Sequence, residues 1–156
     1  MLQGSPSRTA LGAACHRAVH QVLEQGRIFS DPLSLRILGA EAEHAVRIAE
    51  ADSSRRRLRL FIAVRSRFTE DCLAMAVERG VRQVVILGAG LDTYAYRSNF
   101  DDRLHIFEID HPETQTWKQN RLAETSIQVP PNLTFIPADF EWETLKDCLL
   151  YTSRCV

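Results

Sequence analysis

The chain has 156 residues, of which 45% are apolar and 25% are charged, and its formal net charge is −1. These proportions are ordinary for a globular protein, and the length is sufficient for one domain with a buried core. The charge balance argues against nucleic acid as a partner, because nucleic-acid-binding proteins carry a strongly basic surface. A local arginine run, made of Arg55, Arg56, Arg57 and Arg59, is interpreted as the solvated face of a helix.

The cysteine spacing and the N-terminal residues set the expected compartment. Cys15, Cys72, Cys148 and Cys155 form no C-x-x-C pair, which argues against a zinc ribbon or a thioredoxin-type motif, so we expect no metal site. Residues 1–9 are polar and lack the apolar segment of a secretory signal. No apolar run approaches the length of a membrane span. We therefore expect a reduced, cytoplasmic protein without a membrane partner.

The front of the chain is predicted to be helical. Apolar periodicity predicts a helix from Ser7 to about Gln25, which Gly26 ends. Asp31-Pro32 predicts the start of a second helix, with the acid as N-cap and proline in the first turn, and Gly39 closes it. Residues 41–50 are predicted to form a third short helix.

Two further helices are predicted before the first strand. Arg56 to Arg67 is expected to be helical and half buried. Thr69 is a suitable N-cap for a separate helix from Glu70 to Arg79, with acids in its first turn and Gly80 just past its end.

The later part of the chain alternates between strands and helices. The apolar run Gln83–Leu87 predicts a strand buried on both faces of a parallel sheet. Further strands are predicted over Leu104–Ile109 and Leu133–Ile136, with helices over Asp92–Arg97 and Pro112–Thr125. This alternation is typical of an open α/β sheet, in which ligands bind outside the carboxyl ends of the strands.

A glycine turn and an acid follow the first two predicted strands. Gly88-Ala89-Gly90 comes directly after the first strand, and its glycines let a ligand lie against bare main chain. Asp110 ends the second strand, 20 residues beyond Gly90. A carboxylate at this position can accept hydrogen bonds from the hydroxyls of an adenosine ribose. This spacing serves both NAD enzymes and S-adenosylmethionine enzymes. Two alternatives remain: Asp110 only caps the next helix, or Glu108 on the same strand face takes its place.

The third strand ends in a further candidate site. Asp139 can accept a hydrogen bond from the adenine amino group there, and the neighbouring Phe140 can cover the ring. Taken alone, Asp139 is equally typical of a turn residue after Pro137. An NAD-binding fingerprint requires a third small residue at position 93. Thr93 stands there, which weakens the nicotinamide alternative without excluding it.

Several motifs together resemble a known family. They are Arg65-Ser66-Arg67-Phe68-Thr69-Glu70-Asp71, Val85 to Thr93 with Tyr96-Arg97, Phe107-Glu108-Ile109-Asp110-His111-Pro112, Ser7 to Ala10, and Asp31-Pro32. From about residue 7 to 147 the chain resembles the leucine carboxyl methyltransferase family, and within it a bacterial branch of S-adenosylmethionine-dependent methyltransferases. The resemblance implies a class I methyltransferase (Rossmann-like) α/β fold, with helices before an open, mostly parallel sheet, and S-adenosylmethionine as cofactor.

The same resemblance implies which residues hold the cofactor. Arg67 would pair with its carboxylate, because a guanidinium binds carboxylate with two parallel hydrogen bonds. The turn Gly88-Ala89-Gly90 would pass close to the methionine portion. Asp110 would hold the ribose, and Asp139 with Phe140 would hold the adenine. The expected reaction is O-methyl or carboxyl-methyl transfer to an unknown acceptor, and no catalytic residue is assigned.

The resemblance also implies a truncated sheet. Members of the family are roughly twice as long, and the fourth strand, which pairs beside the first, is absent here. We divide the chain into a helical cap region (1–80), the first half of a Rossmann-like domain (81–147) and an atypical tail (148–156). The first strand is left with an unpaired apolar edge, so we expect the fragment to be unstable, oligomeric or inactive. The alternatives left open are an NAD-binding oxidoreductase and a non-catalytic fragment.

Overall fold

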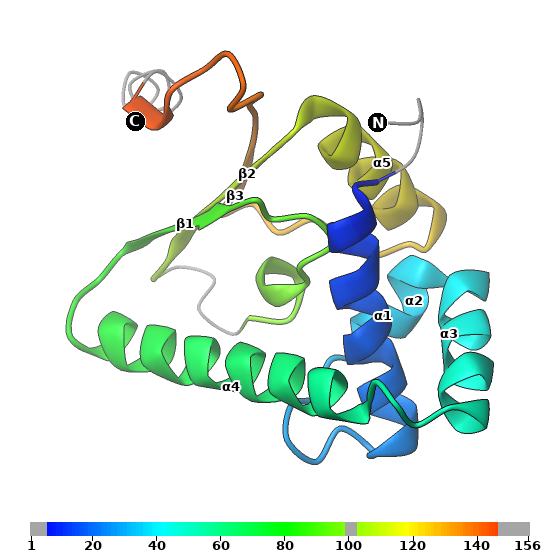
Figure 1. Ribbon diagram of the computed structural model, residues 1–156. Helices are drawn as coiled ribbons and strands as arrows, with labels where there is room; N and C mark the ends of the chain where they lie inside the picture. Colours follow the sequence, from blue (N-terminus) through cyan, green and yellow to red (C-terminus); the bar gives the residue numbers. More distant parts are fainter. Residues whose placement is uncertain (1–5, 99–102, 147–156) are drawn as a thin grey trace.

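The computed structural model describes residues 6–98 and 103–146, and the atypical tail at 148–156, with Cys148 and Cys155, lies outside these ranges. Figure 1 shows a helical front and a parallel sheet, with α1 running between the sheet and the α2–α3 pair. In chain order the elements are α1 (Arg8–Leu23), α2 (Pro32–Leu38), α3 (Ala40–Ala51), α4 (Arg56–Glu78), β1 (Gln83–Leu87), η1 (Tyr94–Tyr96), β2 (His105–Asp110), α5 (Pro112–Glu124) and β3 (Leu133–Pro137). The predicted α/β class is confirmed.

Local capping explains where the first two helices begin and end. The Ser7 hydroxyl accepts the backbone N–H of Ala10 at 3.1 Å and so caps α1. Asp31 caps α2 in the same way, through the backbone N–H of Ser34 at 3.2 Å. Gly39, at φ 58°, separates α2 from α3, a conformation that glycine adopts without strain.

The long helix α4 corrects one prediction. It runs without a break from Arg56 to Glu78, so Thr69 does not start a second helix. The Thr69 hydroxyl instead donates to the carbonyl oxygen of Arg65 at 2.9 Å, inside the helix. The buried residues Ile62 and Val77 lie in the two halves of α4, so packing along its length overrides the local cap signal.

No helix within 6–98 and 103–146 is long and apolar enough to cross a membrane.

Arg59 also differs from expectation. It is only 3% exposed, so it does not belong to the solvated face on which Arg55 to Arg57 lie. Its Nε and Nη2 donate to both carboxylate oxygens of Glu24, at 2.9 and 2.8 Å. Glu24 follows α1, and the pair joins α1 to the start of α4. A buried arginine is stable there because a carboxylate from a distant part of the chain neutralises it.

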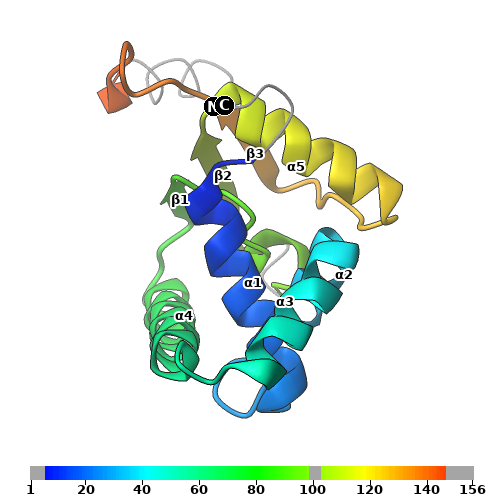
Figure 2. The same cartoon turned by 45° about the vertical axis from the view of Figure 1, so that its right-hand side comes forward.

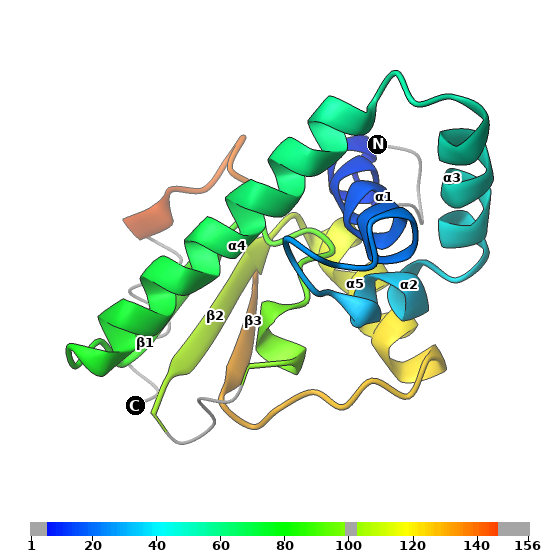
Figure 3. The same cartoon turned by 90° about the horizontal axis from the view of Figure 1, so that it is seen from below.

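The three described strands form one parallel sheet in the order β1-β2-β3. Val84 lies opposite Ile106, and Ile106 lies opposite Leu133, so the three carboxyl ends meet at one edge of the sheet. Seen from below in Figure 3, α4 crosses one face of this sheet. The topology therefore matches the predicted start of an open α/β sheet.

The two faces of β1 differ in exposure, which corrects the prediction that both are buried. Val84 and Ile86 pack against the core cluster that contains Val77 of α4. Val85 and Leu87 point to the other face and are 37% and 54% exposed. Within the described residues β1 pairs only with β2 and forms an edge of the sheet. A strand covered on one face shows this alternation of buried and exposed side chains.

The largest buried apolar cluster among the described residues joins the helical front to the sheet. Ala14 and Ala18 of α1 are fully buried against Leu91, which follows the glycine turn, and Leu122 of α5 belongs to the same cluster. Figure 2 shows α1 between α4 and α3, with its N-terminal end beside the strands. The small side chains of α1 let the helix approach the turn closely, so the helical front is part of the site's support.

Candidate functional site

The glycine turn Gly88-Ala89-Gly90 follows β1, and part of its backbone is exposed. Gly88 and Gly90 have φ values of 61° and 52°, in the left-handed region that favours glycine. A Cβ added at Gly88 meets no heavy atom within 4 Å, whereas one at Gly90 would lie 2.8 Å from the Cβ of Ala10. Gly88 therefore presents accessible bare main chain, and Gly90 permits close contact with α1.

Asp110 lies directly against this turn. One carboxylate oxygen accepts the backbone N–H of Gly90, and the other accepts the backbone N–H of His111 at 2.6 Å. A carboxylate offers about four lone-pair positions, so both oxygens retain accepting capacity. The N-cap of α5 is His111, whose Nδ1 accepts the Glu113 N–H at 3.3 Å. Asp110 is therefore placed to receive hydroxyl donors beside the glycines.

Glu108 belongs to the core rather than to this edge. It is 1% exposed, and the Nζ of Lys118 donates to its Oε2 at 2.6 Å, while the Tyr96 hydroxyl lies 3.2 Å from the same oxygen. Burial raises the pKa of Glu108, and the charge and hydrogen bond of Lys118 oppose that rise without cancelling it. The deeper position of Glu108 on β2 thus serves an internal ion pair.

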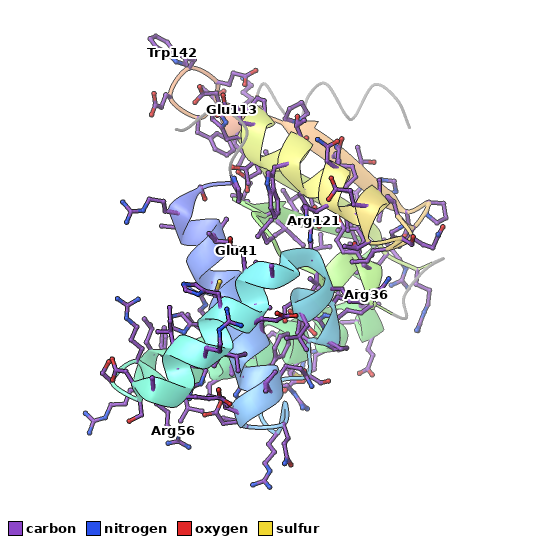
Figure 4. All side chains as sticks on the ribbon, turned by 90° about the vertical axis from the view of Figure 1, so that its right-hand side faces the viewer. Arg36, Glu41, Arg56, Glu113, Arg121 and Trp142 are labelled. Atoms are coloured by element: carbon purple, nitrogen blue, oxygen red, sulfur yellow. The ribbon has the colours of Figure 1, made fainter. Side chains whose placement is uncertain are left out.

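Asp139 stands next to the same edge, after β3. Its Oδ2 lies 3.7 Å from the Nε2 of His111, the residue that follows Asp110. Phe140 is 49% exposed, so its ring is available to cover a ligand. Figure 4 shows the exposed Trp142 projecting at this end of the molecule, near Glu113 at the start of α5. The three strand ends therefore bring the glycine turn, Asp110 and Asp139 together along one edge of the sheet.

Arg67, the predicted partner of the cofactor's carboxylate, lies elsewhere. Its Nε donates to both carboxylate oxygens of Asp71, at 2.8 and 2.9 Å, on an exposed part of α4. A cleft of about 330 Å³ opens between α4 and β1, and Arg65 rather than Arg67 lines it. The cleft also contains Leu87 and Asp92, on either side of the glycine turn.

Helix geometry explains this difference. Residues two positions apart on an α-helix are rotated by about 200° around the helix axis, so their side chains point in nearly opposite directions. Arg65 lies on the same helix side as Thr69 and Leu73, and all three line the cleft. The i, i+4 spacing of Arg65, Thr69, Leu73 and the buried Val77 is visible in the sequence, and it places Arg65 on one side of α4 with the other three.

The segment after the turn is a single 3₁₀ turn, Tyr94–Tyr96, instead of the helix predicted over Asp92–Arg97. Thr93 is 1% exposed, and its hydroxyl donates to the Oδ1 of Asp31 at 2.7 Å. A dinucleotide-binding turn opens a full helix whose N-terminus faces the pyrophosphate. A three-residue turn does not supply that helix end.

A family model described as leucine carboxyl methyltransferase matches residues 10–154. The chain belongs to the leucine carboxyl methyltransferase family. Membership confirms the resemblance inferred from the sequence motifs, and it agrees with the parallel α/β sheet.

Curated relatives from bacteria cover most of the chain. A Frankia alni protein named "Putative S-adenosyl-L-methionine-dependent methyltransferase" is 34% identical over 137 residues, which cover 84% of this chain and 48% of that protein. A protein of the same name from Mycolicibacterium paratuberculosis is 32% identical over 149 residues, covering 86% and 46%. A similarly named Bacillus subtilis protein is 42% identical over 77 residues, covering 49% and 25%. The chain thus spans about half the length of the curated relatives it matches.

Proposed function

We propose that this chain is the cofactor-binding half of an S-adenosylmethionine-dependent methyltransferase. The methionine portion of the cofactor lies along Gly88-Ala89-Gly90, and the ribose hydroxyls donate to Asp110. The adenine amino group donates to Asp139, and the Phe140 ring covers the base. Family membership and the names of the relatives support the choice of cofactor.

One observation carries the proposal: a continuous path of contacts joins the three strand ends. The Gly90 N–H donates to Asp110, the next residue is His111, and His111 lies 3.7 Å from Asp139. Ligands of open α/β sheets bind at this edge. An elongated ligand with a ribose between two other groups fits the order glycine turn, Asp110, Asp139.

The cofactor's carboxylate has two candidate partners. The family resemblance implies Arg67, whereas the cleft between α4 and β1 favours Arg65. Arg67 is already paired with Asp71, and no hydrogen bond or ion pair within the described residues engages the Arg65 guanidinium. We therefore add Arg65 to the proposed site and leave the choice to a paired substitution.

The protein's share of the chemistry is binding and orientation. S-adenosylmethionine supplies a methyl group that its sulfonium already activates. The chain's residues hold the cofactor at one edge of the sheet and keep its reactive end in a fixed place. The proposed acceptor is a carboxylate or hydroxyl oxygen on an unidentified molecule, and a carboxylate acceptor requires no catalytic base.

Isothermal titration of the 156-residue chain tests the proposal. Both S-adenosylmethionine and S-adenosylhomocysteine are expected to bind with one-to-one saturation, and NAD is expected to bind more weakly. Asp110→Asn should weaken binding at least tenfold, or about 1.4 kcal/mol. Asp52→Asn, an exposed position after α3, is the matched control and should not change the affinity. No binding at millimolar cofactor, or tighter binding of NAD, would overturn the proposal.

A further inference from the structure

A buried polar network ties the helical front to the glycine turn. Its centre is Asp31, which is fully buried at the N-cap of α2. Arg17 Nε donates to Asp31 Oδ2 at 2.8 Å, and Thr93 Oγ1 donates to Asp31 Oδ1 at 2.7 Å. A second nitrogen of the Arg17 guanidinium, Nη2, donates to the carbonyl oxygen of Leu91 at 2.6 Å. Two residues just past the turn are thus held by a side chain from α1 and by the N-cap residue of α2.

The network is balanced in charge and extends to α4. Arg97 Nε donates to Thr93 Oγ1 at 3.0 Å, and Arg97 Nη1 donates to Glu70 at 2.9 Å. Two guanidinium groups, Arg17 and Arg97, therefore face two carboxylates, Asp31 and Glu70. Buried charges are expensive unless they are paired and hydrogen-bonded, so the arrangement is stable only when it is complete. Completeness requires the segment after the turn to stay in this position.

The network and β2 contact the turn segment from two sides. On the β2 side, the N–H of Ala89 donates to the carbonyl oxygen of Ile109 at 3.1 Å. On the other side, Arg17 lines the cleft that opens between α4 and β1. Between them, the N–H of Asp92 donates to the carbonyl oxygen of Ala89 at 2.8 Å and closes the turn. Apolar side chains would also fill this space, but only directional hydrogen bonds define the orientations of the Leu91 carbonyl and the Thr93 hydroxyl.

We propose that Arg17 and Asp31 are positioning residues that hold Leu91 and Thr93 and thereby lock the turn Gly88-Ala89-Gly90 in its cofactor-binding conformation. This role rests on the proposed function, because the turn is the proposed cofactor site. It also has a consequence that does not involve the cofactor: losing one bond of the network should open the turn locally, while the sheet stays closed.

Amide hydrogen exchange measures that local opening. Thr93→Val removes the hydroxyl and keeps the side-chain shape. We expect the amides of Ala89 and Asp92 to exchange at least tenfold faster, while the amide of Ile106 in β2, bonded to Asn132, changes less than twofold. Thr93→Ser restores the hydroxyl and should restore slow exchange. Thr125→Val is the matched control, because it removes a 2.6 Å hydroxyl bond at the end of α5.

Arg17→Lys gives a second variant in which the buried charge is retained. The single ammonium nitrogen of a lysine cannot reproduce the two guanidinium nitrogens that donate to Asp31 and to the Leu91 carbonyl. The affinity for S-adenosylhomocysteine should therefore fall about tenfold, while the Ile106 amide stays protected from hydrogen exchange. Unchanged exchange at Ala89 and Asp92, or equal acceleration at Ile106, would overturn the positioning role. If the unsubstituted chain binds no cofactor while Thr93→Val opens the turn as stated, the proposed function fails, and only the structural part of the inference stands, that the network holds the turn in place.

Discussion

The carboxylate of Asp110 at the end of β2 accepts the backbone N–H of Gly90, 20 residues earlier in the turn after β1. Parallel pairing of β1 with β2 brings the two residues to the same edge of the sheet. The contact places an acceptor for ribose hydroxyls beside bare glycine backbone. It also separates the tasks of the two glycines, because Gly90 faces α1 and Asp110 while Gly88 faces open space.

Alanine substitutions at the two glycines should therefore have different effects. Gly90→Ala places a Cβ 2.8 Å from Ala10 at a positive φ, so we expect the free energy of unfolding to fall by about 2–3 kcal/mol. Gly88→Ala meets no atom within 4 Å and should cost only about 1 kcal/mol of backbone strain. Its methyl group occupies the proposed ligand surface, so S-adenosylhomocysteine affinity should fall about tenfold. Urea unfolding and calorimetry measure both quantities; equal stability loss in the two variants would contradict the assignment.

The two arginines of the stretch Arg65-Ser66-Arg67-Phe68 provide a matched pair. Arg65→Gln removes a guanidinium that lines the cleft beside β1, and we expect at least tenfold weaker cofactor binding. Arg67→Gln removes an exposed ion pair with Asp71, so affinity should change less than twofold and stability by at most about 1 kcal/mol. Weaker cofactor binding by Arg67→Gln, with unchanged binding by Arg65→Gln, would support the role that the family resemblance implies for Arg67.

The buried pair of Lys118 and Glu108 predicts a strong effect on stability. Lys118→Met leaves the Glu108 carboxylate buried without its cation, and we expect the free energy of unfolding to fall by about 3 kcal/mol. Adding Glu108→Gln removes the uncompensated charge and should recover most of that loss. Urea denaturation of the two variants provides the test, and an additive loss in the double variant would show that the pair is not coupled.

Glu24 predicts how stability depends on pH. Burial raises its pKa, but the hydrogen bonds and charge of Arg59, with the hydrogen bond from His20, outweigh burial and hold the pKa below its ordinary value. A carboxyl with a depressed folded-state pKa stabilises the fold above its unfolded pKa of about 4.3 and loses that contribution as the pH falls. Glu24→Gln should destabilise the chain at neutral pH, and the difference should shrink below about pH 4.3. A difference that stays constant down to about pH 3 would contradict this account.

The open edge of β1 predicts self-association of the 156-residue chain. Val85 and Leu87 are exposed on this strand, which is a sheet edge within the described residues, and an apolar edge strand pairs readily with another chain. Sedimentation velocity should show concentration-dependent association, and Val85→Lys should reduce it. Val81→Lys, exposed but outside the strand, is the matched control. A monodisperse monomer that melts cooperatively without substitution would count against the prediction.

Local chemistry was enough to locate most of the elements. The carboxylate of Asp31 acts within three residues of its own position, so its capping role follows from the sequence. Gly80, at φ 100°, ends α4 for an equally local reason. The glycine turn and Asp110 were predictable because each follows a strand with a recognisable apolar pattern.

Features that depend on distant partners were not predictable. Arg59 is buried because Glu24, 35 residues earlier, supplies its carboxylate. Thr69 stays inside α4 because packing along the whole helix outweighs one cap signal. That Arg65 rather than Arg67 borders the cleft beside β1 depends on where the sheet lies relative to α4.

The most direct test of the proposed cofactor site is an NMR titration of the isotopically labelled 156-residue chain with S-adenosylhomocysteine. We expect the largest amide shifts at Gly88, Gly90, His111 and Phe140, where the glycine turn and the ends of β2 and β3 meet. Amides of α3, Ala40–Ala51, should remain in place. A spectrum that does not change at millimolar ligand, or shifts confined to α3, would contradict the site.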